Sequence, residues 1–240
     1  MPITNSAVVA AGDANVTPLM SSFTLTFGWT ATAGRVLVAV FAGDKSTGTF
    51  TTPTGWTLGP SIINTDVTLI LFYKVSDGTE TQIAFSWTTL IRMAGAYCME
   101  RDDVTLTGIL SNSANSGATT VTSQDTGSVT APAVPTIAIA AWAMDSINSY
   151  PGGAPLTSQP TWSNSFARVA GQNDTSATIP GGNGGFPAWS VATLGVSANG
   201  GSITTTADWT GGTADQAAAA ILLLAATGGA LTTMSGIWGT

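Results

Sequence analysis

Histidine is absent from this chain of 240 residues, and cysteine occurs once, at Cys98. Without histidine, a Ser-His-Asp triad, a Cys-His pair and a His-ligated zinc site are all excluded. A single cysteine forms no internal disulfide, which excludes a disulfide-rich secreted scaffold. Cys98 lies in the apolar run 94–99, where we expect it to pack as a small hydrophobic side chain.

Charge is also scarce. Charged residues make up 8% of the chain, against about 25% in an ordinary soluble protein, and the formal net charge is −7. The six Lys and Arg residues are scattered. Because nucleic-acid binding needs clustered cations to neutralise phosphates, we expect no nucleic-acid partner. A surface of Thr, Ser, Asn, Gly and Ala suits a protein that packs among neighbours or works outside the cytosol.

No apolar run is long enough to cross a membrane as a helix. The most apolar window, residues 217–226, has about half the length that a spanning helix needs. The N-terminal stretch MPITNSAVVAAGD has no basic start and only a short apolar patch, so we expect no signal peptide. No membrane partner is therefore predicted.

The chain is organised around residues 52–88, whose pattern predicts a unit of β-structure. Residues 67–75 form a continuous apolar run, and a Ser-Asp-Gly-Thr turn follows at 76–79. Residues 82–88 then alternate, with Ile83, Phe85 and Trp87 on one face. This pattern indicates a buried strand, a hairpin turn and a half-buried strand.

The same order of segments returns in the second half of the chain. The matched pairs are 36–41 with 137–144, each followed by an Asp; PTGW at 53–56 with PTW at 160–162; 67–75 with 190–196; 82–87 with 202–209; and 94–99 with 217–226. The repeat places Trp56 and Trp162 at equivalent ends. It also predicts a strand at 217–226, although that window has strong helix propensity.

These segments predict an all-β fold: a single jelly-roll β-sandwich of eight to ten antiparallel strands, built from two similar halves. One shared core is expected because neither half alone could cover its apolar face. Residues 1–20 would be an N-terminal arm or edge strand, residues 21–227 the sandwich, and residues 228–240 a C-terminal tail.

Four motifs carry a resemblance to a known family. They are PTGW at 53–56, FYKV at 72–75, the Asp-Gly turn at 77–78 and FSWT at 85–88. In this order they resemble a jelly-roll module common in tailed-bacteriophage virion proteins and related bacterial surface proteins. The resemblance covers residues 20–226. It implies a jelly roll used in heads, tails or fibres, often for decoration or adhesion, and it supplies no catalytic residues.

The carboxylates are candidates either for chemistry or for simple turn structure. Glycoside hydrolysis needs two carboxylates about 5–10 Å apart, and Glu80 and Glu100 are the only glutamates. Calcium is conceivable at Asp102-Asp103, or at Asp77 with Glu80. The charge cluster 100–103 is predicted to be a solvated turn. No catalytic residue, metal or cofactor is therefore expected.

Tryptophans supply the remaining candidates for binding. Trp29, Trp87 and Trp209 fall on apolar strand faces and are predicted core anchors. Trp162 and Trp189 lie in or beside predicted loops, where an aromatic face could stack on a sugar. Packing within the protein is the alternative for both.

The C-terminal segment is apolar for a tail. After Gly228-Gly229 it carries Leu231, Met234, Ile237 and Trp238. We expect it to dock on a neighbouring subunit, with Ile237 and Trp238 as contacts, since buried aromatics often anchor interfaces. The alternative is that it folds back over its own sheet.

The leading hypothesis is a non-enzymatic structural protein of a bacteriophage virion, a capsid decoration or tail-associated subunit. Its expected partners are other virion proteins and further copies of itself, and its expected location is the virion. The alternative is a carbohydrate-binding module or adhesin with a glycan partner. A glycan-cleaving enzyme is the third possibility.

Overall fold

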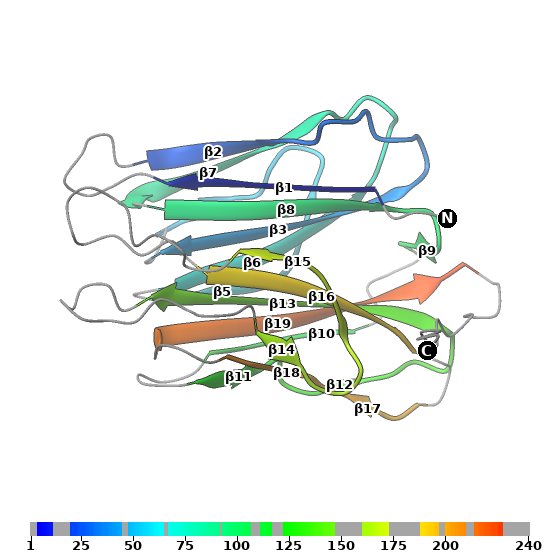
Figure 1. The fold of residues 1–240 in the computed structure, drawn as a ribbon. Coiled ribbons are helices and arrows are strands. Elements are labelled where there is room, and N and C mark those ends of the chain that lie inside the picture. Colours follow the sequence, from blue (N-terminus) through cyan, green and yellow to red (C-terminus); the bar gives the residue numbers. More distant parts are fainter. Residues whose placement is uncertain are drawn as a thin grey trace, which may run out of the picture.

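The structure is a computed structural model that describes residues 4–11, 20–44, 48–64, 67–91, 93–106, 111–116, 122–146, 160–172, 188–196, 200–209 and 214–227. These residues form 19 strands in five sheets and no helix, which confirms the all-β prediction (Figure 1). The pairings between these strands are antiparallel. None of the described residues belongs to a helix that could span a membrane.

The first half of the chain forms a two-layer sandwich. Its inner sheet has the order β1 (Thr4–Ala11), β8 (Met93–Arg101), β3 (Val36–Asp44), β6 (Val67–Val75), β5 (Thr57–Ile63). Its outer sheet has the order β2 (Met20–Thr26), β7 (Gln82–Ile91), β4 (Phe50–Thr51). Aromatic side chains fill the space between the two sheets, among them Phe41, Phe72, Phe85 and Trp87.

The second half forms another sandwich. Its inner sheet has the order β10 (Ser111–Ser116), β19 (Ala214–Ala226), β13 (Thr136–Ser146), β16 (Ala188–Val196), β15 (Ala167–Gln172), and β9 (Val104–Thr105) pairs with β19. Its outer layer contains β11 (Ser123–Asp125), β18 (Thr206–Asp208) and β14 (Thr161–Trp162), together with the pair β12 (Val129–Thr130) and β17 (Ser202–Ile203). Alanine and aliphatic side chains make up most of this second core, together with Trp142, Phe166 and Trp209.

The predicted repeat is present in the strand order. Taken in their order across the sheets, β1, β8, β3, β6 and β5 match β10, β19, β13, β16 and β15, and β2-β7-β4 matches β11-β18-β14. The window 217–226 is part of strand β19, as predicted. The chain therefore adopts the same topology twice.

The expectation of one sandwich with eight to ten strands is not confirmed. The two inner sheets pack against each other, so that the described residues form four layers. The cluster between the inner sheets joins Val38, Val40 and Leu71 of the first half to Ile139, Val191 and Leu222 of the second. Strands β3 and β6 are apolar on both faces because each face is covered, one by an outer sheet and one by the other half.

The turns show one error in the predicted repeat. The backbone N–H of Trp56 donates to the carbonyl of Pro53 at 3.0 Å, and the N–H of Phe166 donates to the carbonyl of Ser163 at 3.3 Å. Phe166, rather than Trp162, therefore occupies the place of Trp56. Trp162 lies in β14, whose counterpart is β4. The Pro-Thr dipeptide that both segments share matches Trp56 with Trp162 in the sequence, although Phe166 is its structural equivalent.

Candidate functional site

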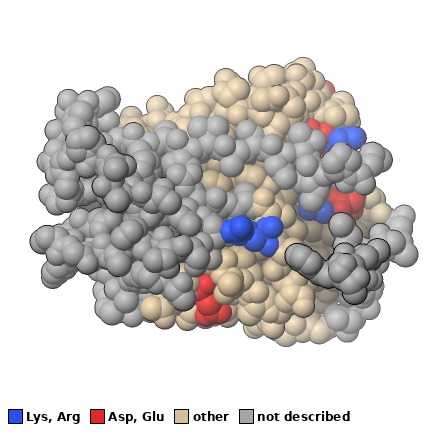
Figure 2. All heavy atoms as spheres, in the orientation of Figure 1, with Lys and Arg blue, Asp and Glu red and all other residues tan. Residues whose placement is uncertain are grey.

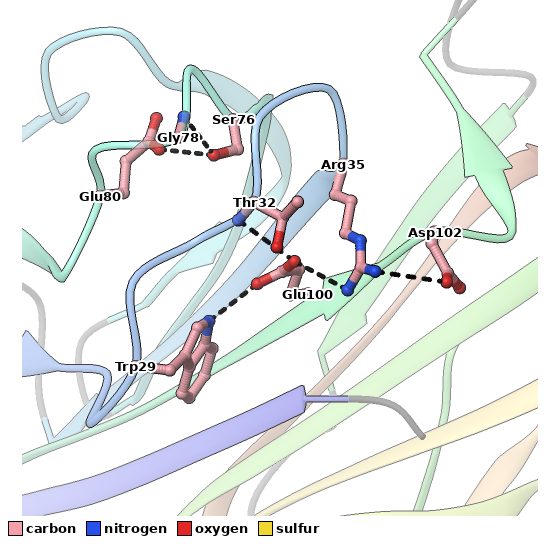
Figure 3. A network of polar contacts seen from close by, with 8 residues as sticks. All are labelled: Trp29, Thr32, Arg35, Ser76, Gly78, Glu80, Glu100 and Asp102. Carbon is pink, nitrogen blue, oxygen red and sulfur yellow. Dashed lines mark hydrogen bonds and ion pairs between the residues drawn. The ribbon is translucent and has the colours of Figure 1, made fainter. Parts of the chain in front are cut away.

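Polar side chains gather at one end of the first half, where β3 begins and β6 and β8 end (Figure 3). We call this group the polar cap: Trp29, Thr32, Arg35, Lys74, Ser76, Asp77, Glu80, Glu100 and Asp102. On the face drawn in Figure 2, the described atoms are mostly tan, with few charged side chains among them. The polar cap is therefore the main candidate for a functional site among the described residues.

Glu100 lies at the centre of the polar cap and is 3% exposed. Its Oε2 accepts a hydrogen bond from Trp29 Nε1 at 2.9 Å. Its Oε1 accepts from the backbone N–H of Thr32 at 3.2 Å and from Arg35 Nη1 at 3.1 Å. Arg35 also faces Asp102, with Nη2 and Oδ2 3.7 Å apart. The buried carboxylate is therefore fully supplied with donors.

Glu80 is held in a similar way beside the turn after β6. Ser76 Oγ donates to its Oε2 at 2.6 Å, the N–H of Asp77 donates to its Oε1 at 3.2 Å, and Lys74 forms an ion pair with it. Burial alone would raise the pKa of Glu80, but these hydrogen bonds together outweigh it and lower the pKa to about 2. Glu80 is therefore ionised at neutral pH.

The cap also ties two turns together through the backbone. The N–H of Ser76 donates to the carbonyl of Arg35 at 2.8 Å, and the N–H of Gly34 donates to the carbonyl of Ser76 at 2.9 Å. Both carboxylates thus stabilise the chain segments that enter β3 and leave β6. The contacts of the polar cap are therefore those of a structural arrangement.

Comparison of the halves shows that the fold does not require the cap. Val36 pairs with Arg101, and its counterpart Ile137 pairs with Leu224, so Glu100 corresponds to Leu223. Leu223 is fully buried in the apolar core of the second half. An apolar residue therefore serves the same topology there, in keeping with the rule that buried ion pairs are replaceable by well-packed hydrophobic groups.

The glutamates do not offer the chemistry of a glycosidase. A general acid needs a raised pKa and access to the substrate, whereas the pKa of Glu80 is lowered. All four carboxylate oxygens of Glu80 and Glu100 already accept hydrogen bonds from protein groups or pair with Lys74. Catalysis by this pair would require breaking those contacts.

The calcium candidates are likewise engaged by the protein's own groups. Asp103 accepts two hydrogen bonds from Arg101, at 2.8 and 2.6 Å. Asp77 Oδ1 accepts from the N–H of Thr79 at 2.9 Å. Within the described ranges, no three His, Cys, Asp or Glu side chains are grouped to hold a metal.

The prediction of a solvated turn at 100–103 is wrong for its first two residues. Glu100 and Arg101 are buried at the end of β8, whereas Asp102 and Asp103 are exposed. Alternation along the strand was the missed signal, because Glu100 shares the face of Ala96 and Cys98, which pack against the outer sheet.

Trp189 is unsuited to glycan contact. It is 2% exposed and lies between the two inner sheets, with its ring centroid 6.1 Å from that of Tyr97. Trp189 lies on the same buried face of β16 as Val191. The Gly-rich sequence before it indicated a loop, so this alternation was missed. The glycan interpretation of Trp189 is therefore wrong.

Trp162 is half-buried and packs against the core of the second half. Its Nε1 donates to Ser190 Oγ at 3.1 Å. Part of the side chain is open to solvent, so it keeps the glycan hypothesis as one possibility beside its packing role. Ile237 and Trp238, the predicted docking residues, lie outside the described residues.

Comparisons with known protein families, curated proteins and solved structures find no match.

Proposed function

We propose that this protein is a non-enzymatic structural subunit of a bacteriophage virion, used as a capsid decoration or a tail-associated protein. The observation that carries the proposal is the strand order of each half. In an eight-stranded jelly roll, the first, eighth, third and sixth strands form one sheet, and the second, seventh and fourth lie in the other. The orders β1-β8-β3-β6 and β2-β7-β4 follow this scheme.

The proposal therefore includes two jelly rolls in place of the single one expected. The second half supports it with β10-β19-β13-β16 and β11-β18-β14. Strand β5 departs from the scheme, because it pairs with β6 at the edge of the inner sheet. Jelly rolls recur in viral capsids and in lectins, so topology alone leaves those two roles to be separated by the residues.

The residues favour a building block over a catalyst. The polar cap uses its carboxylates internally, and the fold places most of its large side chains in three stacked cores. Charged residues make up only 8% of the chain. Few charges therefore lose their hydration when the surface packs against neighbouring subunits. Both features suit a rigid structural subunit whose surface is buried against neighbouring subunits.

The experiment is an add-back assay. Particles made without this gene product are mixed with the purified protein and then sedimented. We expect the protein to sediment with the particles and to saturate at a fixed number of copies. The variant Trp162→Ala should bind particles as well as the unchanged protein, because the proposed role does not use that ring.

Two results would overturn the proposal. One is a protein that stays in the supernatant at every concentration. The other is particle binding that is competed by soluble glycan and lost in Trp162→Ala, which would favour the carbohydrate-binding alternative instead.

A further inference from the structure

The ion pair of the polar cap has no counterpart in the second half, although both halves have the same topology. Glu100 corresponds to Leu223, and by the same pairing Arg35 corresponds to Thr136. Thr136 is uncharged, and its hydroxyl donates to the carbonyl of Val134 at 2.9 Å. The second half therefore places neutral side chains where the first half places an ion pair with a buried carboxylate.

A backbone donor of the cap is also missing from the second half. The N–H groups of Ala31 and Ala131 form equivalent hydrogen bonds, at 2.8 and 2.7 Å, to the segment that leads into the outer layer of each half. Thr32 follows Ala31 and donates its N–H to Glu100, whereas Pro132 follows Ala131. Because proline has no N–H, the second half could not support a carboxylate in the same way.

The register of β8 against β3 is the property that this difference affects. Side chains are largely apolar or small from Ala94 to Met99 in β8 and from Val36 to Gly43 in β3. Because side chains alternate with a period of two, a shift of two residues leaves every side chain on its own face and sets one apolar residue in the place of another. The apolar pattern by itself therefore specifies this register weakly.

Glu100 distinguishes the observed register from both shifted ones. It lies opposite Leu37, where its oxygens accept hydrogen bonds from three donors of the cap. A shift in one direction would place Glu100 opposite Ala39, among apolar side chains and away from these donors. A shift in the other direction would move it to the strand end, opposite Arg35, and leave Trp29 Nε1 without its acceptor. Burying an unpaired carboxylate and losing an acceptor both cost free energy.

We propose that the polar cap is a register lock, which fixes β8 against β3 while the first half folds. Buried ion pairs contribute little net stability, and specifying register is among their best-attested uses. The residues of the cap lie between positions 29 and 102, so the lock is complete without the second half. This role holds whether or not the protein belongs to a virion.

The locked register also determines how the two halves meet. Gly95 of β8 faces Trp189 of β16, and a Cβ at Gly95 would lie 2.5 Å from the indole Nε1. A shift of two residues would bring Met93 or Tyr97 to this point. Because the interior is close-packed, either side chain would collide with the indole and keep the inner sheets from packing as they do. The lock therefore prepares the surface on which the second half packs.

Cys98, the sole cysteine of the chain, can report the register directly. It lies opposite Ala39 in β3, and directly opposed residues have the Cα separation that a disulfide needs. Ala39→Cys should therefore crosslink to Cys98 in the observed register, whereas Leu37→Cys and Phe41→Cys should crosslink to it only after a shift of two residues. Each full-length reporter is refolded in a glutathione redox buffer, and its disulfide is mapped by peptide mass spectrometry.

With the cap intact, we expect the Ala39→Cys disulfide and only background from the other two reporters. Glu100→Leu combined with Arg35→Thr copies the second half. It should raise the shifted disulfides several-fold and lower the Ala39→Cys disulfide correspondingly. Glu100→Gln keeps the shape of the side chain and should act in the same direction, which provides a second variant if the double substitution does not fold. Glu80→Gln removes a cap charge outside β8, so it should lower stability and leave the disulfide pattern unchanged.

Two results overturn the register lock. The first is a folded Glu100→Leu/Arg35→Thr protein, or a folded Glu100→Gln protein where the double variant does not fold, that forms only the Ala39→Cys disulfide. The second is a change of the disulfide pattern in Glu80→Gln as large as in Glu100→Gln. That result would mean that lost stability, rather than the position of Glu100, changes the register.

Discussion

Two buried donors between the inner sheets have no acceptor among the described residues. They are the hydroxyl of Tyr97, which is 1% exposed, and Nε1 of Trp189. Gly95 permits this arrangement, because a Cβ there would lie 2.5 Å from Trp189 Nε1. A buried polar group without a partner costs about 1–3 kcal/mol. Apolar packing therefore stabilises the contact between the halves, and the two buried donors reduce that stability.

Tyr97→Phe should accordingly raise the free energy of unfolding by about 1 kcal/mol, since it removes an unsatisfied hydroxyl and keeps the ring. Tyr73→Phe is the matched control, because Tyr73 hydrogen-bonds to Thr57 and should lose stability instead. Chemical denaturation of both variants measures the difference. A loss at Tyr97 as large as the loss at Tyr73 would mean that its hydroxyl has a partner.

The second prediction at this scale concerns pH. Hydrogen bonds lower the pKa of Glu80 from the ordinary value of 4.5 to about 2 in the folded protein. A lowered folded-state pKa contributes stability that is complete above the unfolded value and is lost as pH falls through the folded value. The contribution of Glu80 should therefore be full above pH 4.5 and should fade between pH 4.5 and about 2.

Glu80→Gln isolates this contribution from the other carboxylates. The unfolding free energy of the unchanged protein should exceed that of the variant above pH 4.5, and the gap should close towards pH 2. A gap that stays constant across the window, or that widens in acid, would contradict the assigned role of Glu80.

At the scale of elements, alternation along the strands decided what could be predicted. Strand β7 alternates and belongs to an outer layer, while β3 and β6 carry apolar side chains on both faces and belong to inner layers. The sequence indicated these patterns, and the strands predicted at 36–41, 67–75 and 82–88 are present as β3, β6 and β7. Continuous apolar strands occur both at the centre of one sandwich and between two, so the pattern could not distinguish the two architectures.

The candidate site was less predictable because its residues are far apart in sequence. Trp29 and Glu100 are 71 residues apart and meet only through the packing of the outer sheet on the inner sheet. Composition correctly indicated few charged groups, but no local pattern places Arg35 beside Glu100. Trp189 was predicted wrongly for a related reason, because the inner sheet that covers its ring belongs to the other half of the chain.

The tryptophans of the two outer layers should differ in their effect on stability. Trp87 packs on Phe41 and Phe50, with ring centroids 5.1 and 5.9 Å away, and its Nε1 donates to the carbonyl of Met20. Trp87→Ala should cost about 3–5 kcal/mol, the usual loss for a large aromatic in a core. Trp162→Ala should cost clearly less, because Trp162 is half-buried. Equal shifts of the denaturation midpoint would show that the two tryptophans contribute equally to stability, against this prediction.

At the scale of the whole molecule, the predicted docking of the apolar tail on a neighbouring subunit implies that folding and assembly can be separated. Deleting residues 229–240 should leave the melting temperature unchanged, as expected of a segment that docks on a neighbouring subunit rather than on its own core. The same deletion should abolish incorporation into particles, with Trp238→Ala giving a partial loss as the anchor residue. A truncated protein that melts several degrees lower and still assembles would place the tail in its own core.

The central claim is that this twofold sandwich is a component of virus particles. Quantitative mass spectrometry of purified particles tests it most directly, by counting copies of this chain relative to the other particle proteins. The account predicts that the protein is present in a fixed number of copies per particle and survives gradient purification with them. Its absence from purified particles, or a copy number that falls with each purification step, would contradict the account.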